Sequence, residues 1–287
     1  MKKLLFLLLF TSLTFAQTDI IVSILPQKIF VDKIGGDKVD VSVMVQAGSS
    51  PHNYEPKASQ MKKISKAELY FSIGVEFETI WLEKFQHQNK QLLISDSSEN
   101  IKKELMKEHQ HSEHEEHPHE KERNQIKDPH IWVNPTNVKL IATNICNALS
   151  KIDSNNSSYY KTNLDNYLKE LDYLDEEIKE ILKNTPKKST FMVFHPAWGY
   201  FAKQYNLTQL PVEVEGKEPK MKALVKLMKK AKKEKVHAIF TQPEFSDKSA
   251  QIIANNLNIN VIKTSPLAPN WSENLINLAK AIAHKEK

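Results

Sequence analysis

The chain has 287 residues, which suits about two domains of ordinary size. Its hydrophobic content of 40% and charged content of 26% are typical of a folded globular protein and argue against a disordered or membrane-embedded one. The formal net charge is +5. It becomes 5 − 2 = +3 if Lys2 and Lys3 are removed with the leader described below. The positive charge is spread along the chain, without a basic stripe interleaved with aromatic residues, which argues against nucleic-acid binding.

Residues 1–16 have the pattern of a secretory signal peptide. Two lysines precede an apolar run over residues 4–10, and residues 14–16 form a small-x-small cleavage site. The apolar run is too short to span a bilayer, although an uncleaved anchor is the alternative. We therefore expect cleavage after residue 16 and export.

The single cysteine, Cys146, lies far from the expected cleavage site. A lipid-modified cysteine at that site and an internal disulfide are therefore not expected. No other segment has the length and apolarity of a transmembrane span. These features predict an exported protein of the periplasm of a two-membrane bacterium, without a membrane anchor.

After the leader, strand and helix patterns alternate. Runs of β-branched residues predict strands, and apolar residues spaced by threes and fours predict helices. We expect strands at residues 19–25, 39–45, 69–73 and 91–95, and helices at residues 27–34, 59–67 and 78–87. This alternation predicts a parallel sheet with helices on its faces. Ligands of such sheets bind outside the carboxyl ends of the strands, and His52 follows the second strand at that position.

Residues 102–127 interrupt the alternation and contain a histidine-rich loop. Five of the 11 histidines of the chain fall there, among several glutamates: His109, His111, His114, His117 and His119. The segment has almost no apolar residues, so it cannot pack a core. Neutral imidazoles near carboxylates collect Zn²⁺. We expect this loop to gather metal, and a solvated insertion without a role is the alternative.

The second half of the chain begins with helices and then repeats the alternation. A helix is expected at residues 135–149, and a long amphipathic helix at residues 158–183 would extend close to 40 Å at about 1.5 Å per residue. Strands are expected at residues 190–194, 207–214, 237–241 and 260–263, and helices at residues 198–205, 221–234, 247–257 and 271–284. The prediction is an α/β protein with lobes at residues 17–154 and 186–287 and a linker helix at residues 155–185.

Three histidines, His52, His130 and His195, each have a proline as a direct neighbour. Proline restricts the backbone, so each imidazole is carried by a short, stiff loop beside a predicted strand end or helix start. Zn²⁺ prefers about four ligands and binds neutral imidazole well, which leaves one position for a carboxylate or a water. The chain has no His-Glu-x-x-His motif, which excludes a zincin protease. The histidines outside this set and the histidine-rich loop are interpreted as surface residues: His87, His237 and His284.

Three motifs carry a resemblance to a known family. They are Ser-Ser-Pro-His-Asn-Tyr-Glu-Pro at residues 49–56, Asp-Pro-His-Ile-Trp at residues 128–132, and Phe-His-Pro-Ala-Trp-Gly-Tyr-Phe at residues 194–201. Together with the histidine-rich loop, they resemble the zinc-type (ZnuA-like) periplasmic metal-binding proteins of ABC transporters. These belong to the TroA-like solute-binding family, cluster A-I, which includes manganese-binding lipoproteins and adhesins. The resemblance covers essentially the whole mature chain.

The resemblance implies two α/β lobes bridged by one long rigid helix, with the metal in the cleft between them. It also implies that His52 and His130 bind the metal from the first lobe and His195 from the second. Manganese-type relatives typically have a glutamate in place of the third histidine. His195 therefore favours zinc, in line with the preference of Zn²⁺ for imidazole and of Mn²⁺ for carboxylate.

The fourth ligand departs from the family pattern. Many members have an aspartate before Pro-Leu in the last strand-to-helix loop, where this chain has Ser265. A water, Glu244 or Glu55 are the candidates, and the first two are favoured. Fewer carboxylates leave the site closer to a charge of 2+, which disfavours the hard ion Mn²⁺.

These features predict a monomeric periplasmic solute-binding protein that captures Zn²⁺ and delivers it to a permease in the inner membrane, driven by a cytoplasmic ATPase. It would catalyse no reaction, and the long helix should restrict hinge closure on binding. A secreted zinc-dependent hydrolase with Glu244 as general base would also use three histidines. A manganese- or iron-binding relative, and a zinc buffer or adhesion protein that serves no transporter, are compatible with the same residues.

Overall fold

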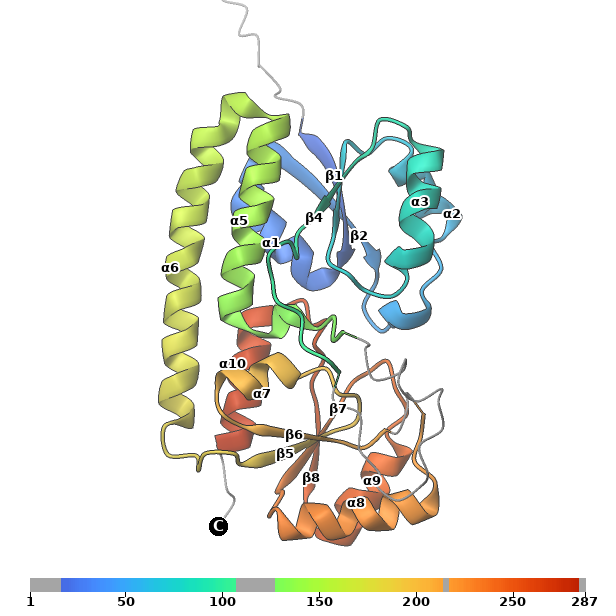
Figure 1. The fold of residues 1–287 in the computed structure, drawn as a ribbon, viewed down its shortest axis with the longest axis vertical. Coiled ribbons are helices and arrows are strands. Elements are labelled where there is room, and N and C mark those ends of the chain that lie inside the picture. Colours follow the sequence, from blue (N-terminus) through green and yellow to red (C-terminus); the bar gives the residue numbers. More distant parts are fainter. Residues whose placement is uncertain (1–16, 107–126, 214–216, 284–287) are drawn as a thin grey trace, which may run out of the picture.

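The chain folds into two α/β lobes arranged along the long axis of the molecule (Figure 1). The structure, a computed structural model, describes residues 17–106, 127–213 and 217–283. Each lobe contains a four-stranded parallel sheet, with strand orders β2-β1-β3-β4 and β6-β5-β7-β8. The strands are β1 (Thr18–Ile24), β2 (Val39–Val45), β3 (Leu69–Ser72), β4 (Leu93–Asp96), β5 (Thr190–Val193), β6 (Thr208–Pro211), β7 (Ala238–Thr241) and β8 (Asn260–Lys263). The predicted fold class, with two parallel-sheet lobes of similar topology, is confirmed.

The inner strands of both sheets are buried almost throughout. Every residue of β3, β5 and β7 is buried, as are the last five residues of β1. The edge strands β4 and β8 are partly exposed. Helices cover both faces of such a sheet, which explains why the inner strands have continuous apolar runs in place of alternating ones.

Helices flank both sheets. They are α1 (Leu25–Gly35), α2 (Ala58–Ile64), α3 (Glu78–Gln88), α5 (Pro135–Ile152), α6 (Ser157–Leu182), α7 (Gly199–Gln204), α8 (Met221–Lys233), α9 (Lys248–Leu257) and α10 (Trp271–Ala283). Within the described residues, every helix is too short or too polar to cross a membrane. The leader expected at residues 1–16 and the last residue of the final predicted helix, His284, lie outside the described residues.

Several element boundaries differ from the sequence prediction; the helix expected at residues 59–67, for example, ends at Ile64. The helix expected to start at Ser59 begins one residue earlier, because the Gln60 side chain accepts a hydrogen bond from the Lys57 N–H (3.0 Å) and caps its start. The strand expected at residues 207–214 is shorter. It ends at Pro211, although the Val212 N–H still donates to the Val193 carbonyl (2.8 Å).

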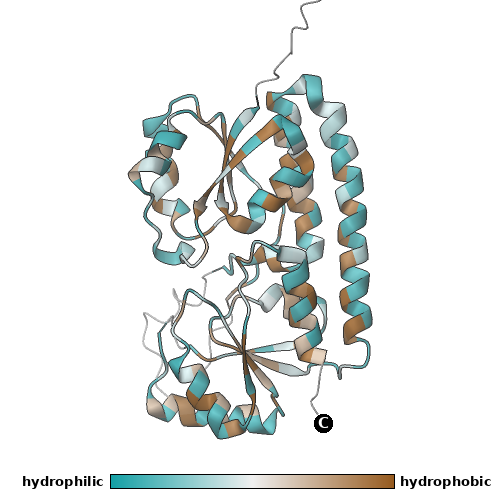
Figure 2. Cartoon of the chain, turned by 180° about the vertical axis from the view of Figure 1, so that it is seen from behind, coloured by the Kyte–Doolittle hydropathy of each residue, from teal (hydrophilic) through white to brown (hydrophobic). Residues whose placement is uncertain are grey.

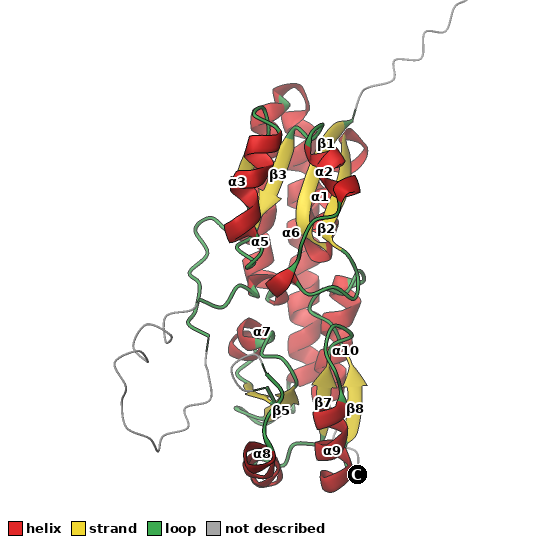
Figure 3. Ribbon diagram, turned by 90° about the vertical axis from the view of Figure 1, so that its right-hand side faces the viewer, coloured by secondary structure: helices red, strands yellow, loops and turns green. Residues whose placement is uncertain are grey.

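The long helix predicted to link the lobes is α6. Its 26 residues extend about 39 Å, and it runs beside both lobes along one side of the molecule (Figures 1 and 3). It packs against α5 and α10 through a buried stripe that includes Tyr167, Leu171, Leu174 and Ile178. The opposite face is polar (Figure 2), as expected for a helix that covers a core from one side.

The two lobes also share a core at their junction. Trp271, at the start of α10, packs edge-on against Phe30 of α1, with ring centroids 5.1 Å apart. Its indole N–H donates to the Trp132 carbonyl (2.9 Å), and the Trp132 indole N–H donates to the Pro266 carbonyl (2.8 Å). All three aromatic side chains are buried. These contacts hold the segment after His130 firmly between the lobes.

A buried carboxylate orders the loop between β3 and α3. Glu78 is 3% exposed and accepts hydrogen bonds from the backbone N–H groups of Ile73 (3.0 Å) and Gly74 (2.7 Å) and from the Ser23 hydroxyl. Gly74 has a φ of 90°, a conformation that glycine adopts without strain. Burial raises the pKa of Glu78 to about 7, although these hydrogen bonds oppose the increase.

Glu78 should therefore make stability depend on pH. Between its unfolded pKa of 4.5 and its folded pKa of about 7, the folded protein binds more protons than the unfolded chain. The free energy of unfolding should then fall as pH rises through this range, by at most about 1.4 kcal/mol per pH unit. Urea unfolding of metal-free protein at several pH values measures this slope. Glu78→Gln should make the slope shallower, and equal slopes in both proteins would contradict the assignment.

Candidate metal centre

The carboxyl ends of the parallel strands deliver the side chains of the candidate site. His52 lies in a short 3₁₀ turn (Pro51–Asn53) after β2, and His195 follows β5 directly. His130 precedes another 3₁₀ turn (Ile131–Val133), which leads into α5. The Ser50 hydroxyl accepts the backbone N–H of His52 (3.3 Å) and caps the first turn. Two imidazoles therefore come from the first lobe and one from the second.

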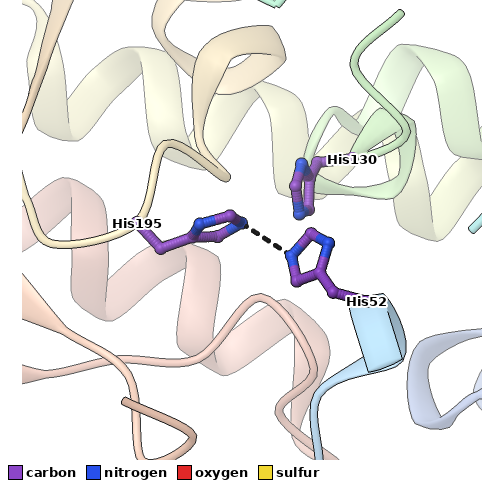
Figure 4. Close-up of side chains that lie close together, drawn as sticks. All are labelled: His52, His130 and His195. Carbon is purple, nitrogen blue, oxygen red and sulfur yellow. Dashed lines mark hydrogen bonds between the residues drawn. The ribbon is translucent and has the colours of Figure 1, made fainter. Parts of the chain in front are cut away.

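The three imidazoles converge at the junction of the lobes (Figure 4). His52 Nε2 lies 3.1 Å from His195 Nε2, and each of the three rings offers a nitrogen within 4.8 Å of the others. Two nitrogens bound to one tetrahedral zinc are about 3.3 Å apart, given Zn–N bonds of about 2.0–2.1 Å. Among the described residues, these histidines form the one group of His, Cys, Asp or Glu side chains close enough to hold a metal. A shift of about 1 Å or less would give each ring a bond to the same ion.

Each imidazole has a carboxylate behind it. The Nδ1 atoms of His52, His130 and His195 lie 2.9, 2.7 and 2.9 Å from oxygens of Glu76, Asp128 and Glu213, respectively. An ionised carboxylate can only accept, so each Nδ1 carries the proton and donates it. In a neutral ring the lone pair is then on Nε2, which faces the centre of the site. This arrangement fixes the tautomer that metal binding requires. The 3.1 Å contact between the Nε2 atoms of His52 and His195 is a hydrogen bond when one of these two rings also carries a proton there.

Two of these supporting carboxylates come from strand ends. Glu76 lies in the β3–α3 loop that Glu78 orders, and Glu213 follows β6. Asp128 accepts both the ring and the backbone N–H of His130, the latter at 2.9 Å. A Cβ at Gly199 would lie 3.0 Å from Asp128 Oδ2, so glycine leaves room for this carboxylate.

The rings differ in exposure. The side chain of His52 is 29% exposed, against 3% for His130 and 7% for His195. Burial lowers the pKa of His52, but the hydrogen bond and negative charge of Glu76 outweigh this effect and place the pKa above its ordinary value. Burial lowers the pKa of His195 below its ordinary value, despite the opposing effect of Glu213. His52 is thus the ring most open to solvent, and burial favours the neutral form of His195.

The space between the rings is small. It is a cavity of about 20 Å³, which suits one ion or one water. Trp132, Gln242 and Phe245 contribute to its walls, and Phe245 stacks on His195 with ring centroids 5.0 Å apart. The site can therefore enclose a bare cation but has little room for an organic molecule.

The proposed carboxylate ligands lie in different settings. Glu244 lines the cavity but is not part of the converging group, and its Oε1 accepts a hydrogen bond from the Ser265 hydroxyl (3.0 Å). Ser265, at the position where family members often have aspartate, thus holds Glu244. Glu55 is exposed and does not line the cavity.

Those of the other predicted histidines that the structure describes are not part of this cluster. The histidines of the histidine-rich loop lie outside the described residues: His109, His111, His114, His117 and His119. His284 also lies outside them. His87 is a surface residue, as expected. His237 is partly exposed and lies outside the converging group, with its Nε2 3.1 Å from the Ala281 carbonyl.

Sequence reasoning did not identify the three supporting carboxylates. Asp128 had a readable signal, because it lies two residues before His130 in a proline-stiffened turn. Glu213 and Glu76 follow strands, but Glu215 and Glu78 lie two residues away and have the same sequence context. Only the packing of distant strands distinguishes them.

Comparisons with known proteins agree on one family. Residues 20–284 match the family described as "ZnuA: Zinc-uptake complex component A periplasmic". A crystal structure of ZnuA is 42% identical to this chain and superposes on it with a TM-score of 0.85. The match covers 93% of this chain and 98% of the ZnuA chain. The manganese ABC transporter substrate-binding lipoprotein PsaA of Streptococcus mitis is 32% identical over 235 residues, 79% of this chain and 72% of PsaA.

A zinc-binding relative is longer. The zinc-binding protein AdcA of Streptococcus pyogenes is 27% identical over 266 residues, 88% of this chain but 50% of AdcA. The match to the family spans nearly the whole described chain, and its members are non-enzymatic binding proteins. The chain therefore belongs to the ZnuA family of metal-binding proteins, the solute-binding components of ABC importers, and is not an enzyme.

Proposed function

We propose that this protein captures Zn²⁺ at His52, His130 and His195 and delivers it to an ABC-type importer. The observation that carries the proposal is the convergence of three imidazole nitrogens without a carboxylate among them. Imidazole suits Zn²⁺, whereas Mn²⁺ prefers oxygen ligands. The zinc-uptake description of the family and the zinc-binding relative AdcA support the same ion.

The supporting carboxylates add to this argument. Neutral imidazoles bring no charge to the ion, so the charge of Zn²⁺ is balanced by Glu76, Asp128 and Glu213 behind the rings. These acidic groups attract a dication without occupying its coordination sphere. The ion thus keeps nitrogen ligands. At the same time, the carboxylates lower the desolvation free energy of placing a 2+ charge in a site where two of the rings are buried.

We propose that a water completes the tetrahedron, with Glu244 as the alternative. The hydrogen bond from Ser265 directs Glu244 Oε1 to the serine, and the 29% exposure of the His52 side chain leaves a side on which solvent can reach the ion. A rotation of Glu244 away from Ser265 would be needed before it could bind the metal.

The setting of this activity follows from the family. Its members work outside the cytoplasm with a membrane permease. For this chain we propose cleavage of residues 1–16, a periplasmic location and a monomeric state. We also propose lobes at residues 17–154 and 186–287 with the linker at residues 155–185, and a histidine-rich loop at residues 102–127 that gathers metal.

Zinc affinity should fall as the pH decreases. Protons compete with the metal for the imidazole lone pairs. Because the pKa of His52 lies above its ordinary value of 6.5, the loss should begin above that pH. Once one ring is protonated in the metal-free protein, affinity should fall about tenfold per pH unit. Competition with a chelator of known affinity, from about pH 8 to 5, measures this dependence, and a flat profile would argue against histidine ligation.

Selectivity tests the proposed cargo. The protein is purified without chelators, its metal content is determined, and Zn²⁺, Mn²⁺ and Fe²⁺ are then titrated in competition. Zn²⁺ should bind with one tight equivalent and displace the other two ions. Preferential retention of Mn²⁺, as the name of the relative PsaA would suggest, would refute the zinc assignment.

A further inference from the structure

The positive charge of the protein is concentrated in one segment. Residues 217–235 contain nine lysines and two glutamates, a net charge of +7. Of the 40 basic residues, nine lie in this segment and two precede residue 17, which leaves 29 against 33 acidic residues, or −4, for the rest. The expectation that positive charge is spread along the chain is therefore wrong. An otherwise acidic protein carries one strongly basic element.

This basic segment is built around α8. Leu224, Leu227 and Ala231 pack into the core of the second lobe. The six lysines of the helix are all exposed: Lys222, Lys226, Lys229, Lys230, Lys232 and Lys233. In the described structure none of the six forms an ion pair, although surface lysines elsewhere do. The charge of α8 is thus not neutralised by the described part of the protein.

The helix also has an exposed apolar patch. Met221 is 68% exposed and Val225 is 41% exposed, one turn apart near the start of α8. The helix lies at the end of the second lobe that is farthest from the first lobe, with no described element beyond it (Figures 1 and 3). An amphipathic helix that combines free lysines with a few exposed apolar side chains has the composition of a membrane-surface element.

We propose that α8 binds the protein to the anionic phospholipid surface of the membrane that contains the permease. Charge complementarity identifies the partner. The helix has lysine without arginine, and a compact, strongly hydrated ammonium suits diffuse attraction to a charged plane better than bidentate recognition of single carboxylates on a protein. Met221 and Val225 can enter the headgroup layer. This association keeps the protein close to the permease between rounds of delivery and does not depend on which metal is bound.

Attraction of this kind is additive and sensitive to salt. Each lysine near an anionic bilayer strengthens binding by about fivefold at low ionic strength, and the effect is screened beyond about 10 Å at 0.1 M salt. Removal of four lysines should therefore weaken binding at least about tenfold. Raising the salt to about 0.5 M should have a similar effect.

Vesicle sedimentation with the mature protein, which begins at residue 17, tests the proposal. The vesicles are phosphatidylcholine alone or with about 30% phosphatidylglycerol. One variant replaces four lysines of α8 with glutamine: Lys222, Lys226, Lys229 and Lys233. A matched control replaces four exposed lysines that form no ion pair in the described structure: Lys62, Lys66, Lys161 and Lys169. Both variants change the net charge by the same amount, and both should retain zinc affinity because neither touches the metal centre.

We expect the unmodified protein and the control variant to bind anionic vesicles and not neutral ones. The α8 variant should lose this binding. Equal losses in both variants would mean that net charge alone matters and would overturn the proposal. Failure of the unmodified protein to sediment, or equal binding to neutral vesicles, would also overturn it. If the protein binds polyglutamate tightly through α8 but does not bind anionic vesicles, the partner of this surface is an acidic protein and not a membrane.

Discussion

Replacement of His195 with alanine should weaken zinc binding by at least about a hundredfold, more than the loss of a supporting residue typically costs. His195 is the one imidazole that the second lobe contributes to the converging group in the described structure. Without it, two rings from the first lobe and solvent would hold the ion, and the ion would no longer link the two lobes. Chelator competition at one equivalent of zinc measures the loss, because it reports the tightest site and not the weaker histidine-rich loop.

A second histidine-to-alanine variant, at a position outside the metal centre, is the control for this experiment. His87 has a side chain that is 66% exposed and lies on α3, outside the converging group, so His87→Ala should leave the tight affinity unchanged. Thermal unfolding of the metal-free proteins checks that His195→Ala folds. Tight binding by a folded His195→Ala protein would remove the second lobe from the proposed site.

Loss of the carboxylate behind His195 should have the next largest effect. Glu213→Ala should weaken zinc binding by about 10–100-fold, the usual cost of removing a supporting group from a metal-bound histidine. The Glu213 side chain is 7% exposed and holds His195 Nδ1 at 2.9 Å. Without the carboxylate, the imidazole is free to rotate and to place its proton on Nε2, which blocks metal binding.

A more conservative substitution separates orientation from charge. Glu213→Gln retains an oxygen that can accept the Nδ1–H, so it should keep most of the geometry while it removes one negative charge. We expect Glu213→Gln to bind zinc better than Glu213→Ala but less tightly than the unmodified protein. The absorption spectrum of bound Co²⁺ should remain tetrahedral in the glutamine variant and change in the alanine variant. Equal affinity in all three proteins would show that Glu213 does not support the metal. Glu83→Ala, at a side chain that is 84% exposed, is the neutral control.

The sequence contained enough information for the fold and for the three histidines. Alternating strand and helix patterns specify two parallel sheets, and such sheets bring their carboxyl ends to one edge. His52 and His195 follow strands, and prolines restrict the loops that carry them, so their positions depend mostly on local chemistry. His130 could be predicted because its turn is bounded by two prolines.

The carboxylates could not be predicted in the same way. Whether Glu76 or Glu78 faces His52 depends on how the β3–α3 loop turns. That turn depends on the burial of Glu78 against Ser23 of another strand. The bond between Ser265 and Glu244 joins loops after two different strands, and no local pattern indicates it. Contacts between distant segments are decided by packing, which a single sequence does not reveal.

The most direct test is to locate the bound ion. Crystals grown with one equivalent of zinc and measured at the zinc absorption edge would give an anomalous peak at the metal. The account predicts one dominant peak about 2.0–2.1 Å from the Nε2 atoms of His52, His130 and His195, with a water as the fourth ligand. A dominant peak elsewhere, or one that touches fewer than three of these rings, would contradict it.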